Sequence, residues 1–230
     1  MISIFAPSGI AEIAKGDDLA EIILANCELN DHDVVVVTSK IVSKAEGRVV
    51  KLDQNDKDAF EKLVRSEAKR VLRRRGKLLI TETHHGYICA NSGIDQSNVG
   101  GGNAVLLPKN PDLSARRLHQ QLVNKTGLVL GVIISDTFGR TWRKGVTDVA
   151  LGCAGVAAMV DLRGTHDSNG RKLVATEIAV ADEIAAAAEL AKPKAARTPV
   201  VIVRGLDKGL FRPSSITREI IRDTSEDLFR

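Results

Sequence analysis

Short apolar runs alternate along the chain with longer segments in which apolar residues recur every three to four positions. The apolar runs are rich in β-branched residues and predict buried strands at residues 34–37, 78–80, 128–134 and 200–203. The periodic segments predict helices: one begins near Leu19, one carries a stripe from Phe60 to Leu72, and others cover residues 114–123, 180–190 and 214–222. Because strands and helices do not alternate regularly, this order favours an α+β fold with mixed or antiparallel sheets over a doubly wound parallel sheet.

The sequence shows no internal point at which to divide it. Its 230 residues contain no repeat, no low-complexity tract and no long linker rich in Pro, Gly or Ser. With 43% hydrophobic residues, a chain of this length can bury a substantial core. We therefore expect residues 1–230 to form a single domain.

The net charge of +4 is too small to identify a class of ligand by itself. Much of the basic excess lies at residues 69–77, which we place at the end of the helix that begins near Phe60, where cations complement the helix dipole. Aromatic residues make up only 3% of the chain, and none lies among these charges. We therefore expect no nucleic-acid partner, because stacking platforms for bases are missing from the basic segment.

Cysteine usage and hydropathy indicate a cytoplasmic protein. Cys27, Cys89 and Cys153 are far apart and form no CxxC pair, which predicts neither a disulfide framework nor a thiolate metal site. The N-terminus has no basic segment leading into an apolar run, and no stretch reaches the roughly 18 apolar residues of a membrane span. We expect no membrane partner.

Three polar stretches directly follow or interrupt apolar strands, where a rigid scaffold usually holds functional loops. The first covers residues 38–48 and contains Ser39, Lys40 and Lys44. Hydroxyls and cations in one loop suit a polyphosphate, which lysine binds as a mobile point charge. A solvated turn after the strand would look similar, so this stretch is ambiguous when taken alone.

The second polar stretch covers residues 91–102 and ends in three glycines. Asp95 and Asn98 lie three residues apart in this Gly-flanked turn. The carboxylate suits Mg²⁺ and the amide suits a nucleotide. The alternative is an Asx-type turn, in which the side chains satisfy only their own backbone.

The third polar stretch covers residues 135–145, which we expect to leave the strand at residues 128–134 as a loop. Asp136 and Thr137 come first, followed by Arg140, Arg143 and Lys144. A carboxylate, a hydroxyl and several cations form a compact group of the kind used in phosphoryl transfer. The alternative is that Asp136 caps a helix and the basic residues face solvent.

Several common site motifs are missing from the sequence. There is no GxxxxGK[ST] and no GxGxxG after a strand, which excludes a P-loop and a dinucleotide-binding fingerprint. No Gly-x-Ser-x-Gly elbow is present, and the adjacent His84 and His85 have no third ligand at metal-binding spacing. We expect this histidine pair to be surface or packing residues, and any nucleotide to bind through another architecture.

The polar stretches are more specific together than apart. Along residues 5–205 the chain carries, in order, Val-Val-Thr-Ser-Lys-x-Val-Ser-Lys-Ala-Glu-Gly-Arg, Asn-Ser-Gly-Ile-Asp-x-Ser-Asn, Ser-Asp-Thr-Phe-Gly-Arg-x-Trp-Arg and Ala-Asp-Glu-Ile-Ala. This order resembles the F420-0:γ-glutamyl ligase family, including the N-terminal ligase half of the two-domain actinobacterial enzyme. The resemblance implies an α+β fold of two interlocked subdomains and a homodimer.

The same resemblance implies an activity. The family joins the carboxylate of the deazaflavin coenzyme precursor F420-0 to the amino group of L-glutamate, and extension of a γ-linked glutamate tail is an open option. GTP converts the acceptor carboxylate into an acyl phosphate, which the amine then attacks. The expected cofactors are GTP as co-substrate and two divalent ions per site, Mg²⁺ or Mn²⁺, with K⁺ as a further option.

Roles for individual positions also follow from the resemblance. Asp95 and Asp136 correspond to catalytic carboxylates that bind the first metal, and Thr137 corresponds to a ligand of the second. The nucleotide-binding positions are Ile10, Ala11, Glu12 and Ile13, through backbone groups, together with Ser39, Lys40, Lys44 and Asn98. Where the family has a Gly-rich loop near the nucleotide, this chain has the stiffer and more basic segment 192–198.

Two further residues are assigned on physical grounds alone. Arg140 and Arg143 are catalytic candidates, because a guanidinium can stabilise charge on a transferring phosphoryl group. Two other functions stay open: another GTP- or ATP-dependent carboxylate-amine ligase on the same scaffold, and a nucleotide-binding module without turnover. Two acidic metal positions beside a basic cluster exceed what binding alone requires, which favours an enzyme.

Overall fold

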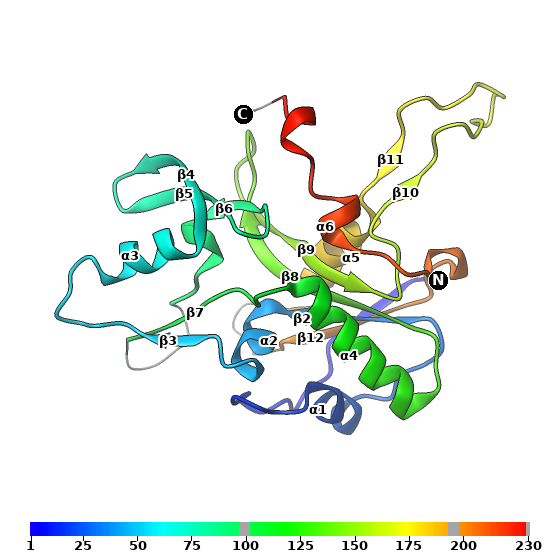
Figure 1. Ribbon diagram of the computed structural model, residues 1–230. Helices are drawn as coiled ribbons and strands as arrows, with labels where there is room; N and C mark the ends of the chain where they lie inside the picture. Colours follow the sequence, from blue (N-terminus) through cyan, green and yellow to red (C-terminus); the bar gives the residue numbers. More distant parts are fainter. Residues whose placement is uncertain (97–101, 193–197, 229–230) are drawn as a thin grey trace.

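The computed structural model describes residues 1–96, 102–192 and 198–228 (Figure 1). The helices in these ranges are α1 (Leu19–Asn26), α2 (Ser39–Ala45), α3 (Ala59–Ser66), α4 (Pro111–Thr126), α5 (Val180–Glu189) and α6 (Ile216–Glu219). The strands are β1 (Ser3–Phe5), β2 (Asp33–Thr38), β3 (Val49–Lys51), β4 (Ala68–Arg75), β5 (Leu78–Thr83), β6 (Ile88–Ala90), β7 (Asn103–Val105), β8 (Leu130–Gly139), β9 (Val146–Ala154), β10 (Val160–Asp161), β11 (Glu177–Ile178) and β12 (Val200–Arg204). Short 3₁₀ turns occur at η1 (Asn91–Gly93), η2 (Lys208–Leu210) and η3 (Thr224–Glu226).

A five-stranded mixed sheet in the order β1-β12-β2-β8-β9 forms the centre of the molecule. β2 and β8 are parallel, and the other neighbouring strands of this sheet are antiparallel. The apolar runs at residues 34–37, 128–134 and 200–203 give β2, β8 and β12, and the run at residues 78–80 opens β5 in a second sheet. The α+β fold with mixed sheets is therefore confirmed.

Apolar side chains cover both faces of the central sheet. Val34 and Val36 of β2 belong to a core that includes residues of α5 and α6, whereas Val35 and Val37 belong to a core with residues of α1, α2 and α4. Successive side chains of a strand point to opposite faces, so one uninterrupted valine run supplies both cores. This double burial explains why β2 reads as a continuous apolar run rather than an alternating one.

Capping residues set the ends of two helices that flank the sheet. The Asp18 carboxylate accepts hydrogen bonds from the Ala20 and Glu21 backbone N–H groups (2.9 and 3.1 Å), which starts α1. Asn110 caps α4, and Gly127 ends it with a left-handed φ of 72°. These caps make α4 longer at both ends than the predicted helix at residues 114–123.

A smaller lobe stands beside the central sheet, on the left in Figure 1. It consists of α3 and the three-stranded antiparallel sheet β4-β5-β6, and the antiparallel pair β3–β7 lies between it and the sheet. Val64, Leu79, Ile94, Ala104 and Leu106 form its own small core. The arrangement in two interlocked subdomains stays a prediction, and we would place the second subdomain here.

The predicted helix that continues from Phe60 to Leu72 is wrong beyond α3. Residues 68–75 form β4, which pairs with β5 through two register shifts. Each bulge inserts an extra residue into a strand, so the apolar positions Ala68, Val71 and Leu72 acquire a spacing that imitates a helix. Local periodicity alone could not separate the two structures.

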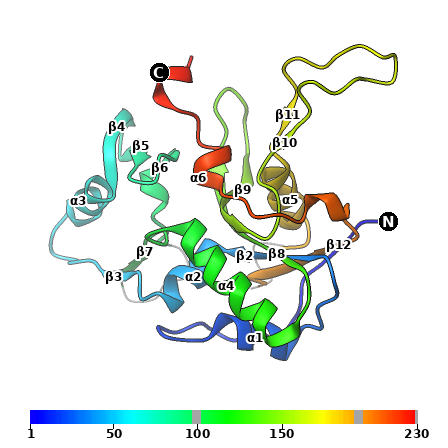
Figure 2. The same ribbon diagram turned by 45° about the vertical axis from the view of Figure 1, so that its right-hand side comes forward.

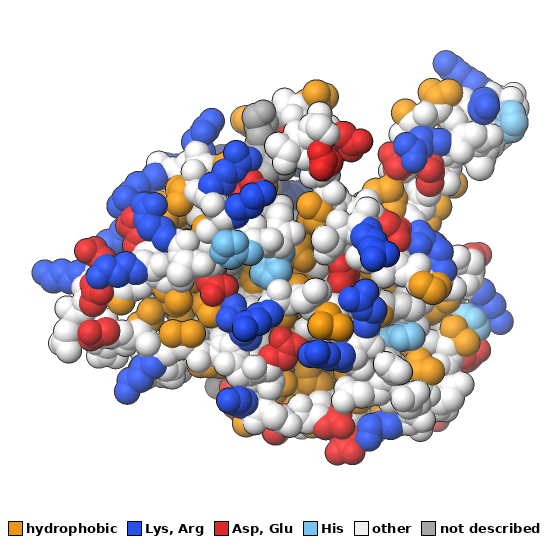
Figure 3. Space-filling view, in the orientation of Figure 1, with side chains coloured by type: hydrophobic (Ala, Val, Ile, Leu, Met, Phe, Trp, Pro, Cys, Tyr) orange, Lys and Arg blue, Asp and Glu red, His pale blue; other side chains and the backbone are white. Residues whose placement is uncertain are grey.

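The basic run therefore lies along an edge strand and not at a helix end. Figure 3 shows its lysine and arginine side chains gathered over the small lobe, at the upper left. Glu82 on β5 pairs with Lys69 (3.1 Å) and Arg70 (2.6 Å), and Glu61 on α3 pairs with Arg74 (3.1 Å). Charged side chains are common on edge strands, where they discourage pairing with other chains.

The prediction of a loop directly after residue 134 is also wrong, because β8 continues to Gly139 and turns back into β9. Asp136 pairs with Val149 and Thr137 with Asp148 in the β8–β9 register. Pairing with β9 provides the backbone partners that make a strand possible despite the polar sequence. The alternative in which Asp136 caps a helix is excluded as well.

Two peripheral segments complete the described chain. The β10–β11 hairpin and the residues between its strands form an arm that projects from the body in both ribbon views (Figures 1 and 2). α6 is shorter than the helix predicted at residues 214–222. Over the described ranges, no helix combines the length and apolar composition needed to cross a membrane.

Candidate active site

A cleft of about 770 Å³ opens at the edge of the central sheet where β2 and the inner half of β8 end. Because these two strands are parallel neighbours, the segments that follow them meet at the same edge, where α/β proteins commonly bind ligands. Seven parts of the chain line the cleft: residues 10–13, the start of α2, β6 with the turn after it, the outer half of β8, Asp148 on β9, residues near the end of α5, and residues 198–199 before β12.

The first polar stretch is a helix and not a loop, because residues 39–45 form α2 directly after β2. Lys40 and Lys44 are four residues apart and therefore lie on one side of α2, where both line the cleft. The Lys44 ammonium contacts the Glu12 carboxylate, and the Lys40 ammonium lies 2.5 Å from Asp95. Helix geometry thus aims two cations into the cleft from one element.

The second polar stretch begins, in its described part, with a tight turn that hydrogen bonds tie to neighbouring elements. Asn91 and Ser92 both adopt left-handed backbone conformations, with φ of 49° and 55°. The Asn91 carboxamide accepts a hydrogen bond from Leu79 N–H (3.0 Å), and the Ser92 hydroxyl donates to the Val64 carbonyl (2.8 Å). These bonds reach β5 and α3. The alternative of a turn whose side chains bond only to its own backbone therefore does not hold for these two residues.

This turn delivers Asp95 to the cleft. Its backbone exchanges two hydrogen bonds with Val105, at 3.0 and 2.8 Å. Gly93 precedes it with φ of 69°, and a Cβ there would lie 2.8 Å from the Leu107 side chain, so glycine suits this position. Backbone pairing on one side and a glycine turn on the other fix the backbone position from which the Asp95 side chain extends.

Asp136 is the most perturbed acid in the cleft. Its pKa is raised to about 7, mainly by burial and further by the neighbouring carboxylates Asp148 and Asp95. Hydrogen bonds from the Thr137 backbone N–H (2.9 Å) and the Ser39 hydroxyl favour the charged form but do not offset burial. A carboxylate crowded by other carboxylates is stabilised by a bound cation.

Thr137 and Asp148 are joined across the β8–β9 hairpin. The Thr137 hydroxyl donates to the Asp148 carboxylate at 2.7 Å, and the Lys192 ammonium lies 2.5 Å from the same carboxylate. The Glu189 carboxylate accepts a hydrogen bond from the Asp148 backbone N–H at 2.9 Å. The wall of the cleft beside Asp136 is therefore a connected polar network.

The residues predicted for the site do not all lie in the cleft. Ile10, Ala11, Glu12, Ile13, Ser39, Lys40, Lys44, Asp95, Asp136 and Thr137 line it. Arg140 and Arg143 are exposed in the turn between β8 and β9, outside the lining, and the Arg140 guanidinium donates to the Lys144 carbonyl at 2.6 Å. Asn98 lies outside the described residues, as does most of the basic segment 192–198.

The described side chains suit a divalent ion that is shared with a ligand. Within the described ranges there is no group of three or more His, Cys, Asp or Glu side chains in position to hold a metal by themselves. Asp95 and Asp136 offer carboxylates and Thr137 a hydroxyl in one cleft, which are oxygen ligands of the kind Mg²⁺ and Mn²⁺ accept. Water and phosphate oxygens would have to complete the coordination, as is usual for Mg²⁺ bound with a nucleotide.

Sequence reasoning missed Asp148 and Glu189, and it treated Lys192 only as the start of a basic loop. Asp148 lies in the sequence Val-Thr-Asp-Val-Ala-Leu, where an acidic residue alternates with apolar ones. An acid in a half-buried strand needs a partner, and this pattern could have indicated one. Glu189 and Lys192 carried no such signal, because only the tertiary fold brings the end of α5 to β9.

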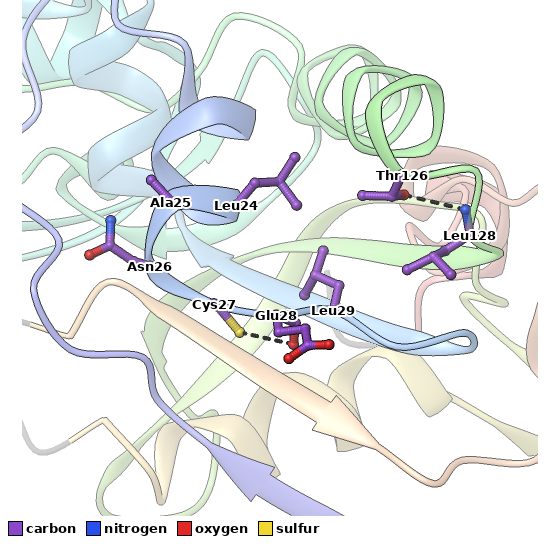
Figure 4. Close-up of a pocket in the computed structure, with 8 residues that line it drawn as sticks. All are labelled: Leu24, Ala25, Asn26, Cys27, Glu28, Leu29, Thr126 and Leu128. Atoms are coloured by element: carbon purple, nitrogen blue, oxygen red, sulfur yellow. Dashed lines mark hydrogen bonds between the residues drawn. The ribbon is translucent and has the colours of Figure 1, made fainter.

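A second hollow fits poorly as a site for a polyphosphate. A hollow of about 580 Å³ at the end of α1 is lined by residues 24–29, Thr126 and Leu128, without a lysine or arginine among them (Figure 4). The predicted packing role of the histidine pair holds for His85, whose ring stacks on Tyr87 and whose Nε2 lies 2.9 Å from the Pro108 carbonyl oxygen.

Comparison with known proteins identifies the class to which this scaffold and cleft belong. The family model for F420-0:Gamma-glutamyl ligase matches residues 9–205. The chain is 40% identical to the Coenzyme F420:L-glutamate ligase of Methanopyrus kandleri, over 95% of this chain and 94% of that relative. It is 37% identical to the protein of the same name from Methanothermobacter thermautotrophicus, over 100% of this chain and 99% of the relative.

A third relative, the Coenzyme F420:L-glutamate ligase of Methanocaldococcus jannaschii, is 38% identical over 95% of this chain and 93% of its own length. The region matched by the family model covers the central sheet apart from β1, the small lobe and every lining segment of the cleft. This chain belongs to the F420-0:γ-glutamyl ligase family.

Proposed function

We propose that the chain is a GTP-dependent ligase that joins L-glutamate to the carboxylate of coenzyme F420-0. The observation that carries this proposal is the convergence of Asp95, Asp136 and Lys44 on one cleft in a member of this family. The names of the relatives supply the acceptor and the amino acid. A nucleotide is needed because a free carboxylate does not form an amide without activation.

The proposed reaction has two steps. An oxygen of the acceptor carboxylate attacks the γ-phosphorus of GTP, the bond to the β-phosphate oxygen breaks, and GDP leaves with the electron pair. The glutamate amine then attacks the carbonyl carbon of the acyl phosphate, phosphate leaves, and the nitrogen loses a proton. A further glutamate could be added to the new γ-carboxylate by the same two steps.

The cleft offers distinct groups for these steps. Lys40 and Lys44 would bind the phosphates, and the backbone at residues 10–13 would line the nucleotide. Asp95 and Asp136 would hold one divalent ion and Thr137 a second. Such ions neutralise the charge that otherwise keeps a carboxylate and a triphosphate apart.

Glu12 competes with this arrangement, because its carboxylate contacts the Lys44 ammonium that would meet a phosphate. The Glu12 side chain is 80% exposed, whereas that of Lys44 is 10% exposed. Glu12 can therefore move into water at little cost, while Lys44 stays where it is. We infer that nucleotide binding replaces this contact.

Product formation tests the reaction. The purified protein is incubated with F420-0, L-glutamate, GTP and Mg²⁺, and we expect a product heavier by one or more glutamyl residues. Parallel samples with ATP in place of GTP, and with other carboxylate acceptors, test the alternative of a different ligase on the same scaffold. Binding of GTP without any product from any acceptor would favour the non-catalytic module.

The first prediction concerns the two acids. Asp95→Asn and Asp136→Asn should each lower ligation below one hundredth of wild type, because the loss of a carboxylate removes a metal ligand but hardly changes side-chain shape. The folded state should survive, since removal of the Asp136 charge relieves its burial and its repulsion by Asp148 and Asp95. Turnover is measured at saturating GTP and Mg²⁺, with circular dichroism as the control. A folded Asp136→Asn variant with wild-type turnover would contradict the assignment of Asp136 as a metal ligand.

A further inference from the structure

Beside Asp136 lies a buried group that we call the Asp148 cluster, which comprises Ser135, Thr137, Asp148 and Lys192. The Asp148 side chain is 3% exposed and that of Lys192 8%. Asp148 Oδ1 accepts a hydrogen bond from Thr137 Oγ1 at 2.7 Å. Asp148 Oδ2 accepts from Ser135 Oγ at 2.9 Å and from Lys192 Nζ at 2.5 Å. Both oxygens of this carboxylate are therefore engaged by the chain itself.

Several independent contacts hold Asp148 in one orientation. Its backbone N–H donates to the Glu189 carboxylate at 2.9 Å, which ties β9 to the end of α5. The Lys192 ammonium also donates to Ser135 Oγ at 3.2 Å, so it bridges two members of the cluster. The ion pair compensates the charge that burial would otherwise penalise. Asp148 is thus held in place and its charge compensated by neighbouring residues in the wall of the cleft.

The consequence falls on Thr137. A hydroxyl has one hydrogen and two lone pairs, and Thr137 gives its hydrogen to Asp148. Its lone pairs are then directed away from Asp148, and Thr137 itself lines the cleft. Without this acceptor the hydroxyl could rotate and present its hydrogen to the cleft, where it would repel a cation.

We propose that Asp148 is a positioning residue that presents Thr137 Oγ1 to a divalent cation as an electron-pair donor, and that Lys192 keeps Asp148 from competing for that cation. The inference rests on the proposed function, which places a divalent ion at Thr137. It follows a general design in which outer residues orient the first ligands of a metal and tune its affinity. Asp148 touches neither substrate nor ion in this account.

Mn²⁺ binding to the whole chain can be measured by electron paramagnetic resonance, with and without GDP. This measurement does not depend on turnover. Asp148→Leu, which removes both acceptor oxygens, should weaken Mn²⁺ binding by about 10–100-fold, the range typical for loss of an outer partner. Asp182→Leu is the control, because Asp182 is a half-buried acid of α5 that accepts a hydrogen bond from the Ala150 backbone N–H on β9 at 2.9 Å and does not line the cleft. It should bind Mn²⁺ as wild type does.

A double-mutant cycle separates positioning from a general structural role. If Asp148 acts through Thr137, then Asp148→Leu combined with Thr137→Val should bind Mn²⁺ no more weakly than Thr137→Val alone. Additive losses, or wild-type affinity in Asp148→Leu, would overturn the proposal. Because Asp148→Leu leaves Lys192 without its counter-charge, Asp148→Leu with Lys192→Met is the second variant for the case of poor folding, and the same loss is expected.

The proposed function and this inference can fail separately. Wild-type Mn²⁺ affinity in Asp136→Asn would contradict the metal site and with it the proposed function. Loss of Mn²⁺ binding in Asp136→Asn together with full binding in Asp148→Leu would leave the proposed function standing and overturn only the positioning role.

Discussion

Surroundings give the acids of this chain different behaviour. Burial and neighbouring carboxylates raise the pKa of Asp136 to about 7, so the charged form of Asp136 is poorly compensated by the protein itself. The Asp148 side chain is buried, but a lysine and two hydroxyls satisfy it. Asp112 is buried as well, yet backbone and hydroxyl donors lower its pKa. Residue type alone therefore does not assign a role, because the donors around each carboxylate decide it.

Lys44 offers a direct test of nucleotide placement at the residue scale. Lys44→Ala should weaken GTP binding by about 10–100-fold, the loss expected for a charge-assisted hydrogen bond. The melting temperature should change little, because the exposed Glu12 carboxylate that contacts Lys44 regains water. Calorimetric titration with GTP measures the change. Lys62→Ala, which removes an exposed lysine paired with Asp56 on the small lobe, is the control, and unchanged GTP affinity in Lys44→Ala would contradict the placement.

At the scale of elements, the sequence predicts what a local pattern determines. The strands β2, β8 and β12 and the helices α1, α4 and α5 follow from uninterrupted apolar runs, helical spacing and capping residues. The outer half of β8 and all of β4 do not, because pairing with β9 and β5 overrides a polar or helix-like sequence. In the cleft, residues directly after β2 could be predicted, whereas Asp148, Glu189 and Lys192 depend on how β9 and α5 pack.

Asp112 at the start of α4 connects three elements and gives a prediction for the fold. Its carboxylate accepts hydrogen bonds from Cys153 N–H on β9 (3.1 Å), from Ile216 and Thr217 N–H at α6 (both 3.0 Å), and from the Ser215 hydroxyl (2.7 Å). Asp112→Asn leaves one oxygen to serve these donors, so the free energy of unfolding at pH 7 should fall by about 2–3 kcal/mol. Urea denaturation measures this difference.

The pH dependence of this difference has a definite sign. Burial alone would raise the pKa of Asp112, but hydrogen bonds from the Thr217 backbone and the Ser215 hydroxyl outweigh it and leave the pKa lowered. A lowered carboxyl pKa contributes stability above its unfolded value of about 3.9 and loses it as pH falls through the folded value. The difference in free energy of unfolding between wild type and Asp112→Asn should therefore become smaller only below about pH 4. A gap that narrows between pH 7 and pH 5 would contradict this account.

At the scale of the whole molecule, the fold gathers seven separate segments at one sheet edge and leaves one arm outside the body. The cleft needs the parallel pair β2–β8, the turn carried by the small lobe, and the end of α5 together. The arm formed by β10 and β11 projects away from all of these (Figure 2). Val174 on the arm is 80% exposed. An isolated two-stranded hairpin is marginally stable in water, so a partner surface would stabilise this arm.

The last prediction is the homodimer that the family resemblance implies. Sedimentation at micromolar concentration should give about 49 kDa, twice the 24.7 kDa of the chain. If the arm contributes to the interface, Val174→Glu should shift the protein towards the monomer, because a buried charge without a partner opposes association. Val129→Glu changes a valine that is 48% exposed on the body, before β8, and should leave the mass at the dimer value. A wild-type mass near 24.7 kDa would contradict the dimer, whereas a dimeric Val174→Glu protein would place the interface elsewhere on the molecule.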